Sequence, residues 1–140
     1  MKHLLIALCC CLPLKHIDLT SGYGYRVHPI TKQYHFHNGI DLSARSDTVF
    51  AIAAGTASVG YNGLIGLYVR ITDGQFCAIY GHLSKILLSN SVVTAGTPIA
   101  ITGATGRVTG EHLHLTIKYG SNYLDPLKFL FELIKPNNHE

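Results

Sequence analysis

Short runs of β-branched and aromatic residues, separated by Gly, Asn, Asp or Ser, recur through most of this 140-residue chain. Runs of about four to eight such residues, bounded by turn-forming residues, are typical of β-strands. Asp73-Gly74 lies between two of these runs and predicts a hairpin, because a tight turn of this kind needs positive φ angles. The predicted strands are residues 48–53, 56–60, 66–72, 75–80, 97–102 and 112–119.

One later segment has the pattern of a helix. Asp125 is suited to the N-cap and Pro126 to the first helical position, and residues 127–134 are mostly apolar. Pro136 then ends the pattern. The fold class that we expect is therefore mainly β: a compact antiparallel β-sheet or β-roll domain with a short C-terminal helix.

The composition excludes two classes of protein. Apolar residues make up 47% of the chain and charged residues 14%, which is far from the composition of a disordered chain. The formal net charge of +3 is too small for the basic stripe of a nucleic-acid-binding protein, so we expect no nucleic-acid partner. The 9 histidines outnumber the 8 acidic residues, and this balance directs attention to metal and proton chemistry.

The N-terminal stretch has the layout of a secretory signal. A short cationic start containing Lys2 precedes residues 4–14, an apolar run broken by three cysteines and Pro13. This run of 11 residues is too short to cross a bilayer, which takes about 20, so we expect no transmembrane span.

These features predict that the chain has two parts, a signal-like segment and an exported domain. Residues 1–19 are the signal-like segment, and residues 20–140 are the functional domain, exported to the periplasm, the cell envelope or the extracellular space. Two alternatives for the first part are a buried N-terminal strand and a lipid anchor on one of the cysteines at positions 9, 10 and 11.

The predicted strand at residues 112–119 carries two histidines on one face. Side chains alternate along a strand, so His112 and His114 point the same way, about 6.6 Å apart along the chain. Leu113 and Leu115 point the other way, into the predicted core. Two imidazoles on one face can bind one metal ion, or one can bind it while the other contacts a metal-bound water.

Further polar side chains lie at turns elsewhere in the chain. His37 and Asp41 are four residues apart around Gly39, which favours an extended or turned backbone with both side chains on one face. A catalytic zinc ion takes three protein ligands and an open position, which His37, Asp41 and one histidine of the 112/114 pair would supply. The other histidine of the pair, with His82, would be free for proton transfer and oxyanion stabilisation.

Motifs of competing hydrolases and nucleotide-binding proteins are absent from the sequence. It contains no His-Glu-x-x-His, Gly-x-Ser-x-Gly or Cys-x-x-Cys. The glycine-rich residues 103–107 lack the Lys-Ser/Thr pair of a phosphate-binding loop, so we expect them to form a flexible wall of a cleft.

Four motifs together resemble the lysostaphin/LytM-type zinc peptidases, which hydrolyse peptide bonds in bacterial peptidoglycan. They are Ser-Gly-Tyr-Gly-Tyr-Arg-Val-His-Pro at 21–29, His-Asn-Gly-Ile-Asp at 37–41, Tyr-Gly-His-Leu-Ser at 80–84, and Thr-Gly at 105–106 followed by His-Leu-His at 112–114. The resemblance runs from about residue 19 to residue 126. It implies a mostly antiparallel β fold with a groove across one sheet.

The resemblance also implies roles for single residues. His37, Asp41 and His114 match the ligands of Zn²⁺, His112 the general base that activates the zinc-bound water, and His82 the partner that steadies the transition state. Arg26, His28 and Pro29 match a recurrent element of the family that is structural or lines the groove.

The function implied is that of a zinc-dependent metalloendopeptidase acting on peptidoglycan cross-links or stem peptides. Glu111 and the pair Leu115-Thr116 differ from the family pattern of Pro and Phe-Glu, and they flank the site without altering a ligand. One alternative is a catalytically silent relative that binds cell wall or activates another hydrolase, and such a protein would be expected to lose ligands. Another is a lipoyl- or biotinyl-type carrier, but the chain lacks its lysine at a hairpin tip.

Overall fold

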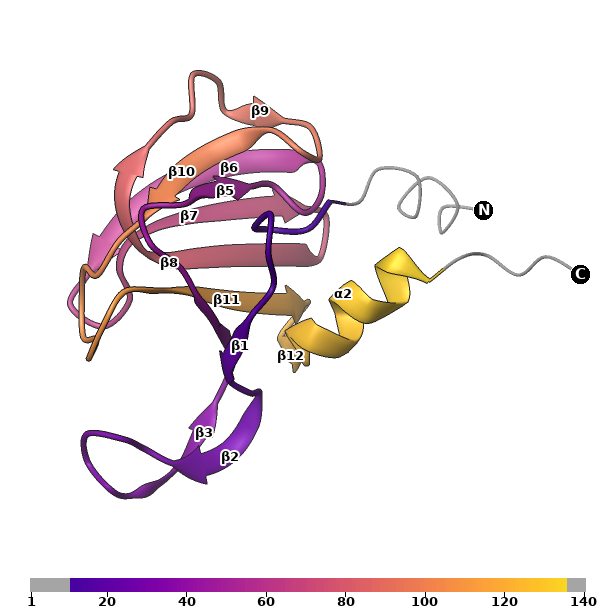
Figure 1. Cartoon of the computed structure of the whole chain (residues 1–140). Helices are drawn as coiled ribbons and strands as arrows, with labels where there is room; N and C mark the ends of the chain where they lie inside the picture. The colour runs from indigo at the N-terminus through magenta and orange to yellow at the C-terminus, as the bar shows by residue number, and fades with distance from the viewer. Residues whose placement is uncertain (1–10, 136–140) are drawn as a thin grey trace, which may run out of the picture.

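Strands dominate residues 11–135, the part of the chain that the computed structural model describes. Figure 1 shows them as a curved sheet with one helix beside it and a small hairpin below it. In chain order the elements are β1 (Leu19–Ser21), β2 (Gly24–Val27), β3 (Tyr34–His37), β4 (Ile40–Ser43), β5 (Thr48–Phe50), β6 (Gly55–Asn62), β7 (Gly66–Asp73), β8 (Phe76–Ile86), β9 (Val92–Val93), β10 (Pro98–Thr102), β11 (His112–Tyr119), β12 (Asn122–Leu124) and α2 (Pro126–Ile134).

The main sheet is antiparallel and has ten strands. Its path runs in the order β1-β4-β11-β8-β7-β6-β9, with β10 paired to β5 and β8, and β12 paired to β11. The predicted mainly β fold is therefore confirmed. Strand β11 matches its predicted bounds and lies between β4 and β8, so the two predicted histidines of this strand sit in the middle of the sheet.

Local predictions are confirmed at the hairpin and the helix. Strands β7 and β8 join through Gly74, whose φ is +58°, although the turn lies one residue later than predicted because Asp73 still pairs with Phe76. Helix α2 begins at Pro126, and the carboxylate of Asp125 accepts hydrogen bonds from the backbone N–H of Leu127 and Lys128.

Several strands differ in length from their predictions, and β8 differs most. Strand β8 extends to Ile86 instead of ending at residue 80, because it pairs with β11 as far as Gly81 and then with β10 from Leu83 onward. Strand β5 ends at Phe50 instead of residue 53. The extension of β8 brings His82 into the sheet.

The core fills the space on one side of β11 and β4. Leu113, Leu115 and Ile117 are fully buried, as the alternation of β11 predicts. Tyr80 is also fully buried, and its hydroxyl oxygen accepts a hydrogen bond from the backbone N–H of Ile52 at 3.0 Å. This packing leaves the other face of β11 free to carry polar side chains.

Residues 11–18 pack against the sheet. Leu14 is only 3% exposed and belongs to the core, and the carbonyl oxygens of Pro13 and Asp18 accept hydrogen bonds from Phe50 and Ser43 at 2.9 and 2.8 Å. Residues 1–10 of the predicted leader lie outside the described residues. Within residues 11–135 there is no helix with the length and apolar character needed to cross a membrane.

Strands β2 and β3 form a separate two-stranded sheet (Figure 1), and its register gives it two different faces. Arg26 lies opposite His35, and Tyr25 lies opposite Phe36, so alternate pairs point to opposite sides. Tyr25 and Tyr34 stack with ring centroids 5.3 Å apart on the outer face and are 68% and 73% exposed. The face with Arg26 is the one that also carries His37.

Candidate metal centre

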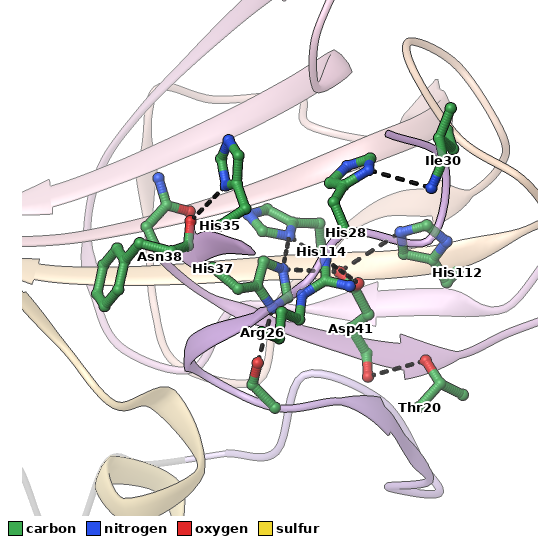
Figure 2. A network of polar contacts seen from close by, with 12 residues as sticks. Thr20, Arg26, His28, Ile30, His35, His37, Asn38, Asp41, His112 and His114 are labelled. Carbon is green, nitrogen blue, oxygen red and sulfur yellow. Dashed lines mark hydrogen bonds and ion pairs between the residues drawn. The ribbon is translucent and has the colours of Figure 1, made fainter. Parts of the chain in front are cut away.

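Three polar side chains from three strands meet beside the middle of the main sheet (Figure 2). His37 ends β3, Asp41 lies in β4, and His114 lies in β11 directly opposite Asp41 in the antiparallel register. The turn between β3 and β4 includes Gly39, where a Cβ atom would clash with the carbonyl oxygen of Leu115 and reach the imidazole of His114. Glycine at this turn therefore lets the backbone lie close enough to β11 for the three side chains to meet.

The spacing of the three donor atoms fits a metal ion. Asp41 Oδ1 lies 3.0 Å from His114 Nδ1 and 3.4 Å from His37 Nε2, and the two nitrogens are 3.3 Å apart. Two ligand atoms bound tetrahedrally to zinc at about 2.1 Å are themselves about 3.4 Å apart. Two imidazole nitrogens and one carboxylate oxygen at these separations could hold one divalent cation.

Hydrogen bonds on the far side of each imidazole set its orientation. His37 donates from Nδ1 to the carbonyl oxygen of Gly22 at 2.8 Å, which leaves Nε2 as the acceptor facing Asp41. His114 is oriented in the opposite sense, because its Nε2 lies 2.9 Å from the hydroxyl of Thr116 and its Nδ1 faces Asp41. The Thr116 hydroxyl donates in turn to Asn38 Oδ1 at 3.5 Å. Such partners fix the tautomer of a metal-binding histidine.

Asp41 is held as a carboxylate. Its burial alone would raise its pKa, but the adjacent imidazoles of His114 and His37 outweigh burial and hold the pKa well below the usual range. The guanidinium of Arg26 adds a positive charge, with Nη2 3.9 Å from Asp41 Oδ2. The group is therefore charged at neutral pH and available to a cation.

Two more histidines lie beside the three donors. His112 Nε2 is 3.4 Å from Asp41 Oδ1, and the rings of His82 and His112 have centroids 4.8 Å apart. His112 Nδ1 lies 2.9 Å from the carbonyl oxygen of Gly110, and His82 Nδ1 lies 2.7 Å from that of Thr105. Each ring can donate from Nδ1 to its carbonyl, which leaves both Nε2 atoms as acceptors that can take a proton.

His82 is held in an unusual environment. It is 5% exposed and has a φ of +59°, a conformation that side chains other than glycine rarely adopt. Desolvation lowers its pKa to about 4, although its hydrogen bond to Thr105 acts in the opposite direction. The imidazole is therefore neutral at pH 7.

The five side chains form the floor of a groove of about 440 Å³. One wall is the β2–β3 hairpin with Arg26 and His28, and another is the loop before β11 with Arg107. His28 also supports its own hairpin, because its Nδ1 accepts hydrogen bonds from the backbone N–H of Ile30 and Thr31 at 3.2 Å each. These positions agree with the structural and groove-lining parts expected for Arg26, His28 and Pro29.

All five residues singled out from the sequence, His37, Asp41, His82, His112 and His114, therefore lie together. Sequence reasoning treated Thr116 only as a departure from a family pattern and missed its contact with His114. The period of two along β11 contains the signal, because it places positions 112, 114 and 116 on one face.

Known peptidases are similar to this chain in sequence and in structure. The sequence profile of Peptidase family M23 matches residues 35–126. The DD-carboxypeptidase/endopeptidase Mpg of Neisseria meningitidis serogroup B is 35% identical over 118 residues, which cover 82% of this chain and 27% of that protein. The peptidoglycan DD-endopeptidase ShyA of Vibrio cholerae is 41% identical over 93 residues, covering 64% of this chain and 22% of that protein. The chain thus spans about a quarter of the length of these curated relatives.

Solved structures show the same fold. A zinc-containing peptidase from Vibrio cholerae superposes with a TM-score of 0.76 and 29% identity, covering 92% of this chain and 40% of that one. The catalytic domain of lysostaphin from Staphylococcus simulans superposes with a TM-score of 0.71 and 28% identity, covering 82% of this chain and 92% of that one.

Proposed function

Because this chain belongs to Peptidase family M23, we propose that it is a zinc-dependent endopeptidase that hydrolyses peptide bonds in bacterial peptidoglycan, in cross-links or stem peptides. The observation that carries the proposal is the cluster of His37, Asp41 and His114, whose donor atoms all lie within 4.8 Å of one another. The names of the relatives, which include DD-endopeptidases, support the substrate class.

We propose that Zn²⁺ is the metal and that His37 Nε2, Asp41 and His114 Nδ1 hold it. Nitrogen and carboxylate donors are ordinary zinc ligands, and three protein ligands are the number found in catalytic zinc sites. When bound, the ion would lower the pKa of a water molecule and polarise the scissile carbonyl.

The two remaining histidines then divide the proton chemistry. His112 would accept a proton from the attacking water at Nε2 and return it to the nitrogen of the leaving amine. His82, which stays neutral because its pKa is about 4, would accept a hydrogen bond from the same water and steady it through the transition state. Both roles use the Nε2 atoms, because both Nδ1 atoms are committed to backbone carbonyls.

The alternative of a catalytically silent relative is not favoured. A protein that only binds cell wall or activates another hydrolase has no need to keep three metal donors and two adjacent bases. This chain keeps all five side chains and holds them in hydrogen-bonded positions.

We further propose export to the periplasm, the cell envelope or the extracellular space, directed by the signal-like segment at residues 1–19. The substrate class supports this location, because peptidoglycan lies outside the cytoplasm. Residues 11–18 contact the sheet and Leu14 lies in the core, so the leader that is removed would be shorter than residues 1–19 and would end before Cys11. A lipid anchor on Cys9, Cys10 or Cys11 is the alternative route to the envelope.

Digestion of purified peptidoglycan tests the proposal. Wild-type protein loaded with one equivalent of zinc should release peptide fragments, identified by their masses, and Asp41→Ala should release none under the same conditions. Asp73→Ala, which changes an exposed carboxylate at the β7–β8 hairpin, serves as the matched control and should digest like wild type. Equal digestion by wild type and Asp41→Ala would remove the assigned site.

A further inference from the structure

We propose that Arg26 and Arg107 form a subsite for a free carboxylate on the substrate residue that contributes the leaving amine. The inference rests on the proposed hydrolase function and names the substrate class within it. The two arginines would make the enzyme prefer peptides in which the carbon next to the scissile nitrogen bears a carboxylate.

Arg26 lies within reach of the reacting bond. It occupies the face of the β2–β3 hairpin that also carries His37, and its Nη2 is 3.9 Å from Asp41 Oδ2. Its side chain remains 28% exposed, so the guanidinium is open to the groove that it lines. A substrate carbonyl placed at the three metal donors would bring the next residue of the peptide beside this guanidinium.

Arg107 approaches the same groove from a different loop, and that loop is tied down. The hydroxyl of Thr105 donates to the carbonyl oxygen of Leu83 at 2.7 Å, and the backbone N–H of Arg107 donates to that of Leu64 at 3.0 Å. Among residues 11–135, no carboxylate lies within ion-pair distance of the Arg107 side chain. The guanidinium of Arg107 is therefore exposed and has no carboxylate partner in the described part of the protein.

The charges around the groove are complementary to an anion. Asp41 is the one carboxylate among the described residues that line the groove, whereas Arg26 and Arg107 both line it. The pKa of His28, on the same wall, is lowered by desolvation and then by the positive charges of Arg26 and Arg107. Arginine pairs with carboxylates through two parallel hydrogen bonds, so two arginines suit a carboxylate better than a neutral amide.

The chemistry of a peptide bond decides which substrate residue carries this carboxylate. The scissile peptide bond joins the carbonyl carbon of one residue to the nitrogen of the next. When that carbonyl comes from the α-carboxyl group of the first residue, this group is part of the bond and cannot be a free carboxylate. The nearest α-carboxylate that can be free therefore belongs to the residue that leaves as the amine. A glycine bridge that continues beyond the scissile bond offers no such group.

A pair of matched substrates and a pair of variants test the inference. The substrates are a cross-linked muropeptide dimer with a free α-carboxylate beside the scissile nitrogen and the same dimer with a carboxamide there. Zinc-loaded wild type should cleave the acid form with a kcat/KM about tenfold or more above the amide form, mainly through a lower KM. Arg26→Gln and Arg107→Gln should each lower kcat/KM for the acid dimer about tenfold more than kcat/KM for the amide dimer.

Arg70→Gln is the matched control, because Arg70 is an exposed arginine on β7 whose guanidinium lies 5.8 Å from the ring of Tyr68, away from the groove residues. It should leave both rates unchanged, and the zinc content of every variant should equal that of wild type. Equal cleavage of the two dimers by wild type, or an equal loss on both dimers in the groove variants, would overturn this inference alone. Cleavage of neither dimer by wild type would overturn the hydrolase function and the inference with it.

Discussion

The hydroxyl of Thr116 decides which nitrogen of His114 can bind a cation. The hydroxyl contacts His114 Nε2 at 2.9 Å and donates a hydrogen bond to Asn38 Oδ1. Thr116 is only 4% exposed. Val has nearly the same shape as Thr but no hydroxyl, so Thr116→Val removes the hydrogen bond and keeps the packing. We expect the variant to bind Zn²⁺ about 10- to 100-fold more weakly in calorimetric titration.

Thr116→Ser keeps a hydroxyl at this position and is the control for Thr116→Val. Thr116→Ser should keep most of the zinc affinity that Thr116→Val loses. Wild-type affinity in Thr116→Val would mean that His114 is oriented by its ring packing and that the hydroxyl has no part in positioning it.

His82 makes the fold sensitive to acid in a definite direction. Desolvation lowers its folded-state pKa to about 4, whereas an unfolded histidine titrates near ~6.5. Between these two values the unfolded chain binds a proton that the folded protein does not, so acidification favours unfolding. The stabilising effect of a neutral His82 is fully present above pH ~6.5 and is lost as the pH falls toward 4.

His82→Asn tests this dependence, because Asn does not titrate and tolerates a positive φ. With a chelator present, the Tm of wild type should fall more steeply between pH 6.5 and pH 4 than the Tm of His82→Asn. Two parallel Tm profiles over this range would show that His82 titrates normally in the folded protein.

At the scale of elements, the turn between β3 and β4 is the joint that assembles the centre. Gly39 lies against the backbone of β11, and a Cβ atom there would meet the carbonyl of Leu115 and the ring of His114. Gly39→Ala should destabilise the protein by about 1–3 kcal/mol and weaken zinc binding, because the turn must move away from β11. The measurements are urea unfolding and metal titration.

Gly63→Ala is the control, since a Cβ at Gly63 meets no atom within 4 Å. It should change neither stability nor zinc affinity by a measurable amount. If Gly39→Ala had as little effect as Gly63→Ala, the turn between β3 and β4 would have space for a Cβ atom, contrary to its close approach to β11.

The elements also show how far the sequence predicts this fold. Strand β11, the β7–β8 hairpin and helix α2 follow from local patterns, namely alternation, a turn glycine and an N-cap aspartate. The continuation of β8 through Gly81 and His82 has no such pattern, because it depends on pairing first with β11 and then with β10. The separate β2–β3 sheet was not predicted either, since its outer face leaves Tyr25 and Tyr34 exposed.

The site divides in the same way. His37, Asp41, His82, His112 and His114 were found because residue type and spacing carry their chemistry. The residues that orient them act through contacts made only after folding. Thr116 reaches His114 within one strand, but the carbonyl of Thr105 reaches His82 across 23 positions of the chain.

At the scale of the whole molecule, the N-terminal segment helps to close the core. Leu14 is buried among core residues, although it lies in the predicted leader. Leu14→Ala should lower the free energy of unfolding by about 2–5 kcal/mol in urea denaturation, because it leaves a cavity. Leu19→Ala, at a position 40% exposed, should cost much less, and equal effects of the two would place Leu14 outside the core of the protein in solution.

The central claim is that three side chains from β3, β4 and β11 hold one zinc ion and prepare a water for attack. Anomalous diffraction at the zinc absorption edge, from crystals of the protein with one equivalent of zinc, tests it most directly. We predict a single strong peak about 2.0–2.2 Å from His37 Nε2, a carboxylate oxygen of Asp41 and His114 Nδ1. A peak bound by other residues, or no peak between these three, would contradict the account.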